Sequence, residues 1–185
     1  MPQFNGFLSL LDSPSFMTIW YWVVLIGLWS VLGRGTLGVP GDVIARARRE
    51  PTGEPGLILL DWLSLCLPRW RLGPREGAVA LAIALFVLTS LAILGFGYGL
   101  ELAQAALLLL VPLCILFVMR VRLARSLTPL IEAARAGETP PGETARAALR
   151  RILLHRRLFT VLSILSVTVT AMWGTLWGLM HPNGL

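Results

Sequence analysis

The stretch GAVALAIALFVLTSLAILGFGYGLELAQAALLLLVPLCILFVM, residues 77–119, contains a single charged side chain, that of Glu101. A helix needs about 17 to 25 mostly apolar residues to cross the ~30 Å hydrocarbon core of a bilayer. The stretch is therefore long enough for two such helices, divided near Glu101. Because so few residues separate them, we predict that they form a tight antiparallel hairpin.

Two further apolar runs of similar length lie elsewhere in the chain. The predicted spans are about 16–33, 77–100, 102–119 and 158–180, all within a single membrane domain that covers residues 1–185. The composition agrees, because 56% of the residues are hydrophobic, only 14% are charged, and the mean hydropathy is +0.74. A soluble domain of this size is far less apolar. The predicted fold class is an all-α membrane protein with four transmembrane helices.

The positively charged side chains predict the orientation. All sixteen are arginine, a usage typical of GC-rich bacterial genomes; seven lie between the first and second spans and nine between the third and fourth. Loops rich in arginine stay on the cytoplasmic side of the membrane. We therefore predict a bacterial inner-membrane protein with cytoplasmic loops 34–76 and 120–157 and with both termini periplasmic.

The same arginines predict a lipid contact. An arginine near an anionic membrane surface contributes about 1 kcal/mol of attraction. The side chains expected to provide most of it are Arg46, Arg48, Arg49, Arg150, Arg151, Arg156 and Arg157. A sequence pI of about 10.9 is also found in nucleic-acid-binding proteins, but here the arginines flank apolar runs, so no nucleic-acid partner is expected.

The two loops carry weaker signals for structure. Gly and Pro punctuate the first loop, which leaves room for a helix around 42–50 and for a short apolar helix at 57–67, lying in the inner interface or packed under the bundle. The second loop is helical on both sides of GETPPGE, which predicts a cytoplasmic helical hairpin between the third and fourth spans. Its first helix is expected to kink or restart at Pro129, with Thr128 as cap, and to stop at Gly137.

Two motifs in the spans concern packing. GFGYG, residues 95–99, is similar to a potassium-channel filter, but it follows a full-length span and not a short pore helix, so it predicts a helix end and a turn. In the fourth span a stripe of small residues allows close approach of another helix, within the bundle or in a partner. The stripe consists of Ser166, Thr170, Gly174 and Gly178.

The sequence contains none of the patterns HExxH, GxSxG or the P-loop, so no enzyme activity is expected. The two cysteines, Cys66 and Cys114, have neither CxxC spacing nor a neighbouring histidine, and two thiols are too few to ligate an iron–sulfur cluster. No metal or other cofactor is therefore predicted. His155 lies among arginines and is expected to be solvated or to face lipid headgroups.

Three segments, DSPSFMTIWYW, LGVPGDVIARARR and GLELAQ, carry a resemblance to a known family. They are similar to segments of small bacterial membrane proteins that are labelled "component of SufBCD complex". The resemblance covers mostly the first fifty residues and the second hairpin. It implies a four-helix inner-membrane architecture, and the label further implies a link to iron–sulfur cluster assembly.

Two functions are compatible with these features. The first, which we favour, is a non-catalytic accessory or assembly subunit that docks on other subunits of a larger inner-membrane complex. The alternative is a homo-oligomeric channel or a small membrane subunit of a transporter. Because no predicted span contains Asp, Glu, Lys, Arg or His, a proton or ion pathway through a single copy is disfavoured.

Overall fold

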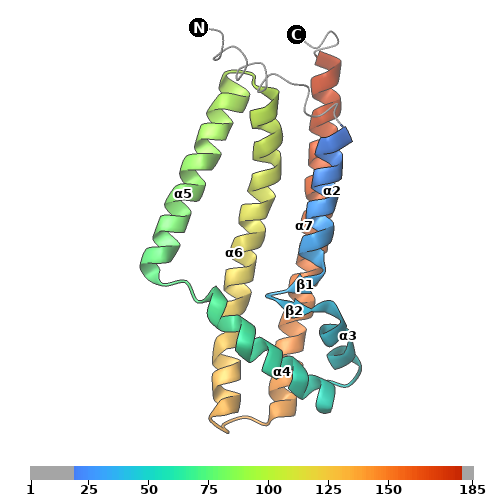
Figure 1. Cartoon of the computed structure of the whole chain (residues 1–185), viewed down its shortest axis with the longest axis vertical. Coiled ribbons are helices and arrows are strands. Elements are labelled where there is room, and N and C mark those ends of the chain that lie inside the picture. Colours follow the sequence, from blue (N-terminus) through green and yellow to red (C-terminus); the bar gives the residue numbers. More distant parts are fainter. Residues whose placement is uncertain (1–18, 181–185) are drawn as a thin grey trace. The chain divides into compact units, whose positions relative to one another are not determined.

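The structure, a computed structural model, describes residues 19–180, which contain six α-helices (Figure 1). The helices are α2 (Ile19–Gly33), α3 (Gly41–Arg49), α4 (Glu54–Cys66), α5 (Pro74–Ala92), α6 (Glu101–Arg135) and α7 (Pro141–Met180). The shorter elements are strands β1 (Gly35–Thr36) and β2 (Val39–Pro40), the 3-10 helix η1 (Leu67–Trp70) and the π-helix η2 (Ile93–Gly97). The predicted helical class is confirmed.

Within residues 19–180, three helices are long and apolar enough to cross a membrane: Pro74–Gly97, which joins α5 to η2, and the longer helices α6 and α7. They contain the predicted spans 102–119 and 158–180 and all but the last residues of 77–100. By contrast, α2 has 15 residues, which rise about 22 Å at ~1.5 Å per residue and fall short of ~30 Å. The first three residues of the predicted span 16–33 lie outside the described residues.

The chain divides into two compact units. In the described part, unit 1 consists of residues 19–29, 77–115 and 162–180. Unit 2 consists of Ser30–Glu76 and Leu116–Val161. Helices α2, α6 and α7 each contribute one part to unit 1 and the other part to unit 2.

Polar groups hold the helices of unit 1 together. The buried Gln104 side chain of α6 donates to the Gly95 carbonyl at 2.7 Å and accepts from the Trp173 indole of α7 at 2.9 Å. The hydroxyl of Tyr21 in α2 donates to the Ala105 carbonyl at 3.2 Å. In hydrocarbon, where no water competes, such bonds join helices that apolar contact alone would not hold.

The GFGYG segment forms the end of a helix and a turn, as predicted. It begins in η2, and Gly99 takes a φ of +73° before α6 starts. Gly95 lies close against α6, because a Cβ there would be 2.9 Å from both the backbone nitrogen and Cγ of Gln104. A side chain at residue 95 would therefore push α5 and α6 apart.

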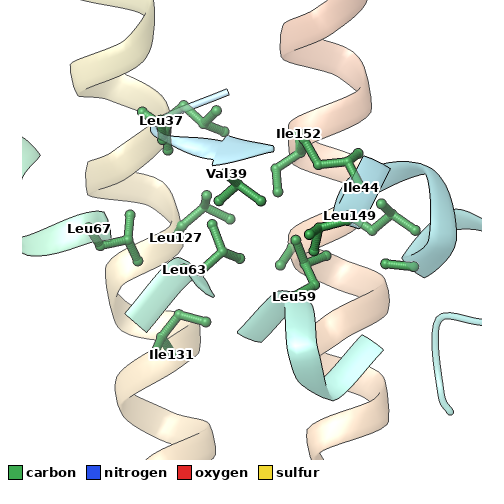
Figure 2. Packing of buried hydrophobic residues seen from close by; sticks show 14 of the residues in the cluster. Leu37, Val39, Ile44, Leu59, Leu63, Leu67, Leu127, Ile131, Leu149 and Ile152 are labelled. Carbon is green, nitrogen blue, oxygen red and sulfur yellow. The ribbon is translucent and has the colours of Figure 1, made fainter. Parts of the chain in front are cut away.

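Unit 2 has an apolar core, shown in Figure 2. Leu59 and Leu63 of α4, which are completely buried, meet Leu127 of α6 and Ile152 of α7 there. The predicted short apolar helix thus exists as α4, and it buries one face in this core while its opposite side carries Asp61 and Ser64. Figure 1 shows α4 lying across the neighbouring parts of α6 and α7.

The short hairpin of β1 and β2, two residues in each strand, is an addition to the helical fold that the sequence did not predict. Gly35 pairs with Pro40 and Thr36 with Val39, and both turn residues have positive φ, 57° at Leu37 and 95° at Gly38. Positive φ at both central residues defines a type I′ turn, which matches the twist of a hairpin. Leu37 adopts this unfavourable conformation because its side chain is buried in the core of unit 2.

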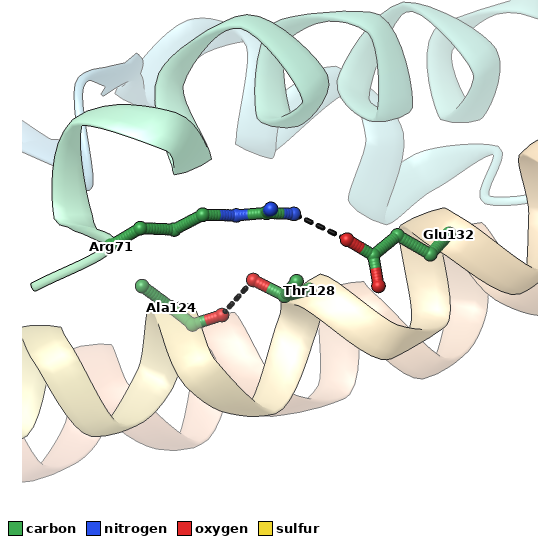
Figure 3. Close-up of polar contacts among 4 residues, drawn as sticks. All are labelled: Arg71, Ala124, Thr128 and Glu132. Carbon is green, nitrogen blue, oxygen red and sulfur yellow. Dashed lines mark hydrogen bonds and ion pairs between the residues drawn. The ribbon is translucent and has the colours of Figure 1, made fainter. Parts of the chain in front are cut away.

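Helix α6 continues through Pro129, so the predicted restart there is wrong. Thr128 does not act as a cap; its hydroxyl donates to the Ala124 carbonyl one turn earlier, at 2.9 Å (Figure 3). One turn later, Glu132 forms an exposed ion pair with Arg71, the residue that follows η1 (Figure 3).

The predicted stop of this helix at Gly137 is confirmed. Gly137 has a φ of +74°, and its N–H donates to the Ala134 carbonyl while that of Glu138 donates to Ala133. This pair of bonds is the Schellman motif, in which glycine is the favoured residue.

Candidate functional site: an arginine-lined pocket in unit 2

Helices α3 and α7 border a pocket with a volume of about 650 Å³. We call it the basic pocket. Arg48 and Arg49 come from the last turn of α3, and Arg156 and Arg157 from α7. The apolar part of the wall includes Ile44 and Leu153, and Thr160 adds a hydroxyl.

The basic pocket has no acidic side chain in its wall. Within residues 19–180, no carboxylate lies within ion-pairing distance of its four arginines; the two ion pairs found there are Arg46–Asp42 and Arg71–Glu132. Four like charges around one cavity repel one another, and an anion in the cavity would relieve that repulsion. The pocket is therefore suited to a negatively charged ligand with an apolar portion.

The structure brings together four of the seven arginines predicted to contact anionic lipid and places the other three elsewhere. Arg46 pairs with Asp42 at 2.8 Å, one turn earlier on the exposed face of α3. Arg150 lines a separate cavity that also contains Glu143. Arg151 donates to the Ser126 carbonyl of α6. The prediction of lipid contact itself stays a prediction for all seven.

A second cavity in unit 2, of about 90 Å³, was not expected from the sequence. We call it the small cavity. Arg120 of α6 and His155 of α7 line it together with Thr36, and it shares Arg156 and Thr160 with the basic pocket. Its wall, too, contains no acidic side chain.

The expectation that His155 is solvated or faces headgroups is wrong, because its side chain is only 7% exposed. Burial, and after it the charge of Arg120, lower the pKa of His155 below its ordinary value. Both effects favour the neutral form of the imidazole. Arg120 also was not singled out in the sequence, although it is the first arginine after the apolar run of the third span.

The small-residue stripe of the fourth span belongs to unit 1. Ser166, Thr170 and Gly174 are buried within the chain, and Gly178 is partly buried. The side chain of Ser166 has no hydrogen-bond partner in the described residues. These positions therefore contribute to packing inside unit 1, and a role in partner binding stays a prediction.

No protein-family model matches the chain, and no curated protein and no solved structure matches it either.

Proposed function

We propose that the chain is a four-pass protein of a bacterial inner membrane, with both termini periplasmic. We further propose that it is a non-catalytic accessory or assembly subunit, which anionic lipid anchors at the basic pocket. The observation that supports this most directly is the group of four arginines around one cavity that has no carboxylate in its wall.

The position of the pocket in the sequence agrees with a lipid ligand. Arg156 and Arg157 immediately precede the fourth predicted span, and arginines at the inner end of a span lie at headgroup level. Ile44 and Leu153 offer apolar contact to the glycerol and the first acyl carbons. A volume of about 650 Å³ is within the range of cavities that hold small organic ligands.

The proposed role as a subunit rests on α5. Every residue of this helix, which lies entirely in the described part, is at least partly exposed, and its apolar side chains include Leu81, Leu85 and Phe86. A span inside a self-contained bundle buries a stripe on its neighbours. The long, apolar and unburied surface of α5 supports docking on another membrane subunit.

The lipid proposal predicts a difference between two double variants with the same change of charge. Arg48→Gln with Arg49→Gln removes charge from the basic pocket, whereas Arg46→Gln with Arg150→Gln removes it elsewhere. At about 1 kcal/mol for each arginine, the first pair is expected to weaken binding of phosphatidylglycerol roughly 30-fold. Native mass spectrometry of the detergent-purified protein measures this. An equal loss of affinity in the two double variants would indicate diffuse electrostatic attraction and would contradict binding at the basic pocket.

The accessory role is tested by copurification from native membranes followed by mass spectrometry. A partner present in fixed stoichiometry, and lost when Leu81 and Leu85 of α5 are changed to bulkier Trp, supports the proposal. A homo-oligomer that conducts ions in planar bilayers would favour the alternative function, a channel. A fluorescent protein fused to the C-terminus fluoresces only in the cytoplasm, so a fluorescent fusion would contradict the proposed topology.

A further inference from the structure

The small cavity is built to receive an anion. The polar side chains among its lining residues are those of Arg120, Arg156, His155, Thr36 and Thr160, of which the Thr160 hydroxyl already donates to the Arg156 carbonyl at 3.1 Å. The side chains of Arg120, Arg156, His155 and Thr36 can donate a hydrogen bond, and no acidic side chain lines the cavity. A water occupies about 30 Å³ of liquid, so about 90 Å³ leaves room for a group the size of one phosphate.

Arg120 is held in place by one hydrogen bond, and its Nε has no acceptor among the described residues. One of its terminal nitrogens donates to the Leu32 carbonyl at 2.9 Å, and its guanidinium carbon lies 5.9 Å from the ring centre of Trp70. Its Nε is buried and has no hydrogen-bond partner in the described residues. A buried N–H without an acceptor is unfavourable, and a phosphate oxygen in the cavity would provide one.

His155 adds a donor without adding charge. The neutral imidazole has one N–H and one acceptor nitrogen. The His155 side chain is more than nine-tenths buried, and it lines the small cavity. A phosphate oxygen beside the ring would accept that N–H.

The small cavity and the basic pocket adjoin each other, because Arg156 and Thr160 line both. Together they offer two groups of cationic donors: Arg120 with His155 on one side, and Arg48, Arg49 and Arg157 on the other. A headgroup with one phosphate can fill one of the two. Filling both requires a ligand that carries two phosphates on a short linker.

We infer that the small cavity and the basic pocket form one site for a lipid headgroup with two phosphates, as in diphosphatidylglycerol (cardiolipin). One phosphate binds Arg120 and His155, the other binds the arginines of the basic pocket, and Arg156 lies between them. This inference rests on the proposed function, because it requires that the basic pocket hold lipid.

The test compares binding of cardiolipin and of phosphatidylglycerol to the full chain in mild detergent, by native mass spectrometry. The wild type is expected to bind cardiolipin at least 10-fold more tightly than phosphatidylglycerol. Arg120→Gln and, separately, His155→Leu are expected to bring the ratio of the cardiolipin affinity to the phosphatidylglycerol affinity close to one. Neither variant is expected to weaken the binding of phosphatidylglycerol. Arg48→Gln with Arg49→Gln is expected to weaken binding of both lipids.

Two variants distinguish a loss of lipid binding from a loss of folding. His155→Leu leaves Arg120 and its bonds in place, and Arg120→Lys keeps the charge while losing the planar fork. Each variant is used only if its thermal unfolding without lipid matches that of the wild type within a few degrees. An unchanged ratio in the variants that remain folded, or a wild-type ratio near one, would overturn the inference.

The remaining outcomes separate the two proposals and the two sources of phosphate. If phosphatidylglycerol and cardiolipin both fail to bind, the proposed lipid anchor is wrong as well as the inference. If phosphatidylglycerol binds at the basic pocket and cardiolipin shows no advantage, only the inference fails. If inorganic pyrophosphate at millimolar concentration displaces cardiolipin from the wild type, the site is one for soluble diphosphates, and the lipid assignment is overturned.

Discussion

The two units of the chain have opposite interiors. In unit 2 the core cluster consists mainly of leucines, isoleucines and valines, with a few alanines, from α3, α4, α6, α7 and the β-hairpin. In unit 1 many of the buried positions are small or polar, such as Ala103, Gln104 and Thr170, while large apolar side chains face outward, including Phe86 at 73% and Leu81 at 59% exposure.

The difference agrees with the proposed topology, in which unit 1 lies in the membrane and unit 2 in the cytoplasm. In water, each Å² of apolar surface removed from the solvent contributes about 25 cal/mol, so a core of large side chains stabilises unit 2. In hydrocarbon that driving force is absent, and helices are held by close contact of small residues and by hydrogen bonds. The Gln104 bonds to Gly95 and Trp173 are contacts of the second kind.

The largest effect is expected from truncating the core of unit 2. Leu63→Ala removes a completely buried side chain of α4 and is expected to lower the free energy of unfolding by about 2 to 5 kcal/mol. The matched control is Leu81→Ala on α5, where the side chain is exposed and the loss should be small. Denaturant titration in mild detergent measures both, and similar losses for the two would contradict the contrast between the units.

A smaller effect is expected at the tight turn of unit 1. Gly95→Ala places a Cβ 2.9 Å from backbone and side-chain atoms of Gln104 and is expected to cost about 1 to 3 kcal/mol, as overpacking does. At Gly97 the nearest atom to an added Cβ is 3.9 Å away, so Gly97→Ala should be nearly neutral. If both variants melt like the wild type in detergent, close approach at Gly95 does not stabilise this unit.

Much of the helical layout could be predicted because local sequence determines it. Uninterrupted apolar runs predicted the positions of α5, α6 and α7, and a glycine after the last periodic residue predicted the stop at Gly137. The hairpin at Leu37 and Gly38 could not be predicted, because TLGV has no Asn-Gly or Asp-Gly pair. Its positive φ at a leucine is tolerated only through burial in a core assembled from distant segments.

The sequence predicted that the candidate site would be basic, but it did not predict which residues form it. Arginine counts along the chain pointed to a basic surface, and the i, i+4 spacing of Asp42 and Arg46 could have signalled their pairing. The grouping of Arg48 with Arg156 depends on the packing of α3 beside α7, which no local pattern specifies. The burial of His155 depends on the same tertiary packing.

The smallest effect expected is a pH dependence specific to unit 2. Because burial and the charge of Arg120 lower the pKa of His155 in the folded state, the unfolded state takes up a proton first as the pH falls. Stability is therefore full above the unfolded value of about 6.5 and decreases as the pH falls below it toward the lower folded pKa. Carboxylates titrate near pH 4, so pH 7.5 to 5.5 isolates the histidine contribution.

Thermal unfolding in detergent across that range tests the assignment. The wild type is expected to lose stability between pH 7.5 and 5.5, and His155→Gln, which cannot take up a proton, should lose less. The chain contains one other histidine, His181, which lies outside the described residues, so His181→Gln is the matched control and should keep the wild-type slope. A slope that survives in His155→Gln and disappears in His181→Gln would show that the pH dependence does not come from the core of unit 2. It would also remove the evidence that His155 is neutral beside Arg120, and with it the uncharged donor of the small cavity.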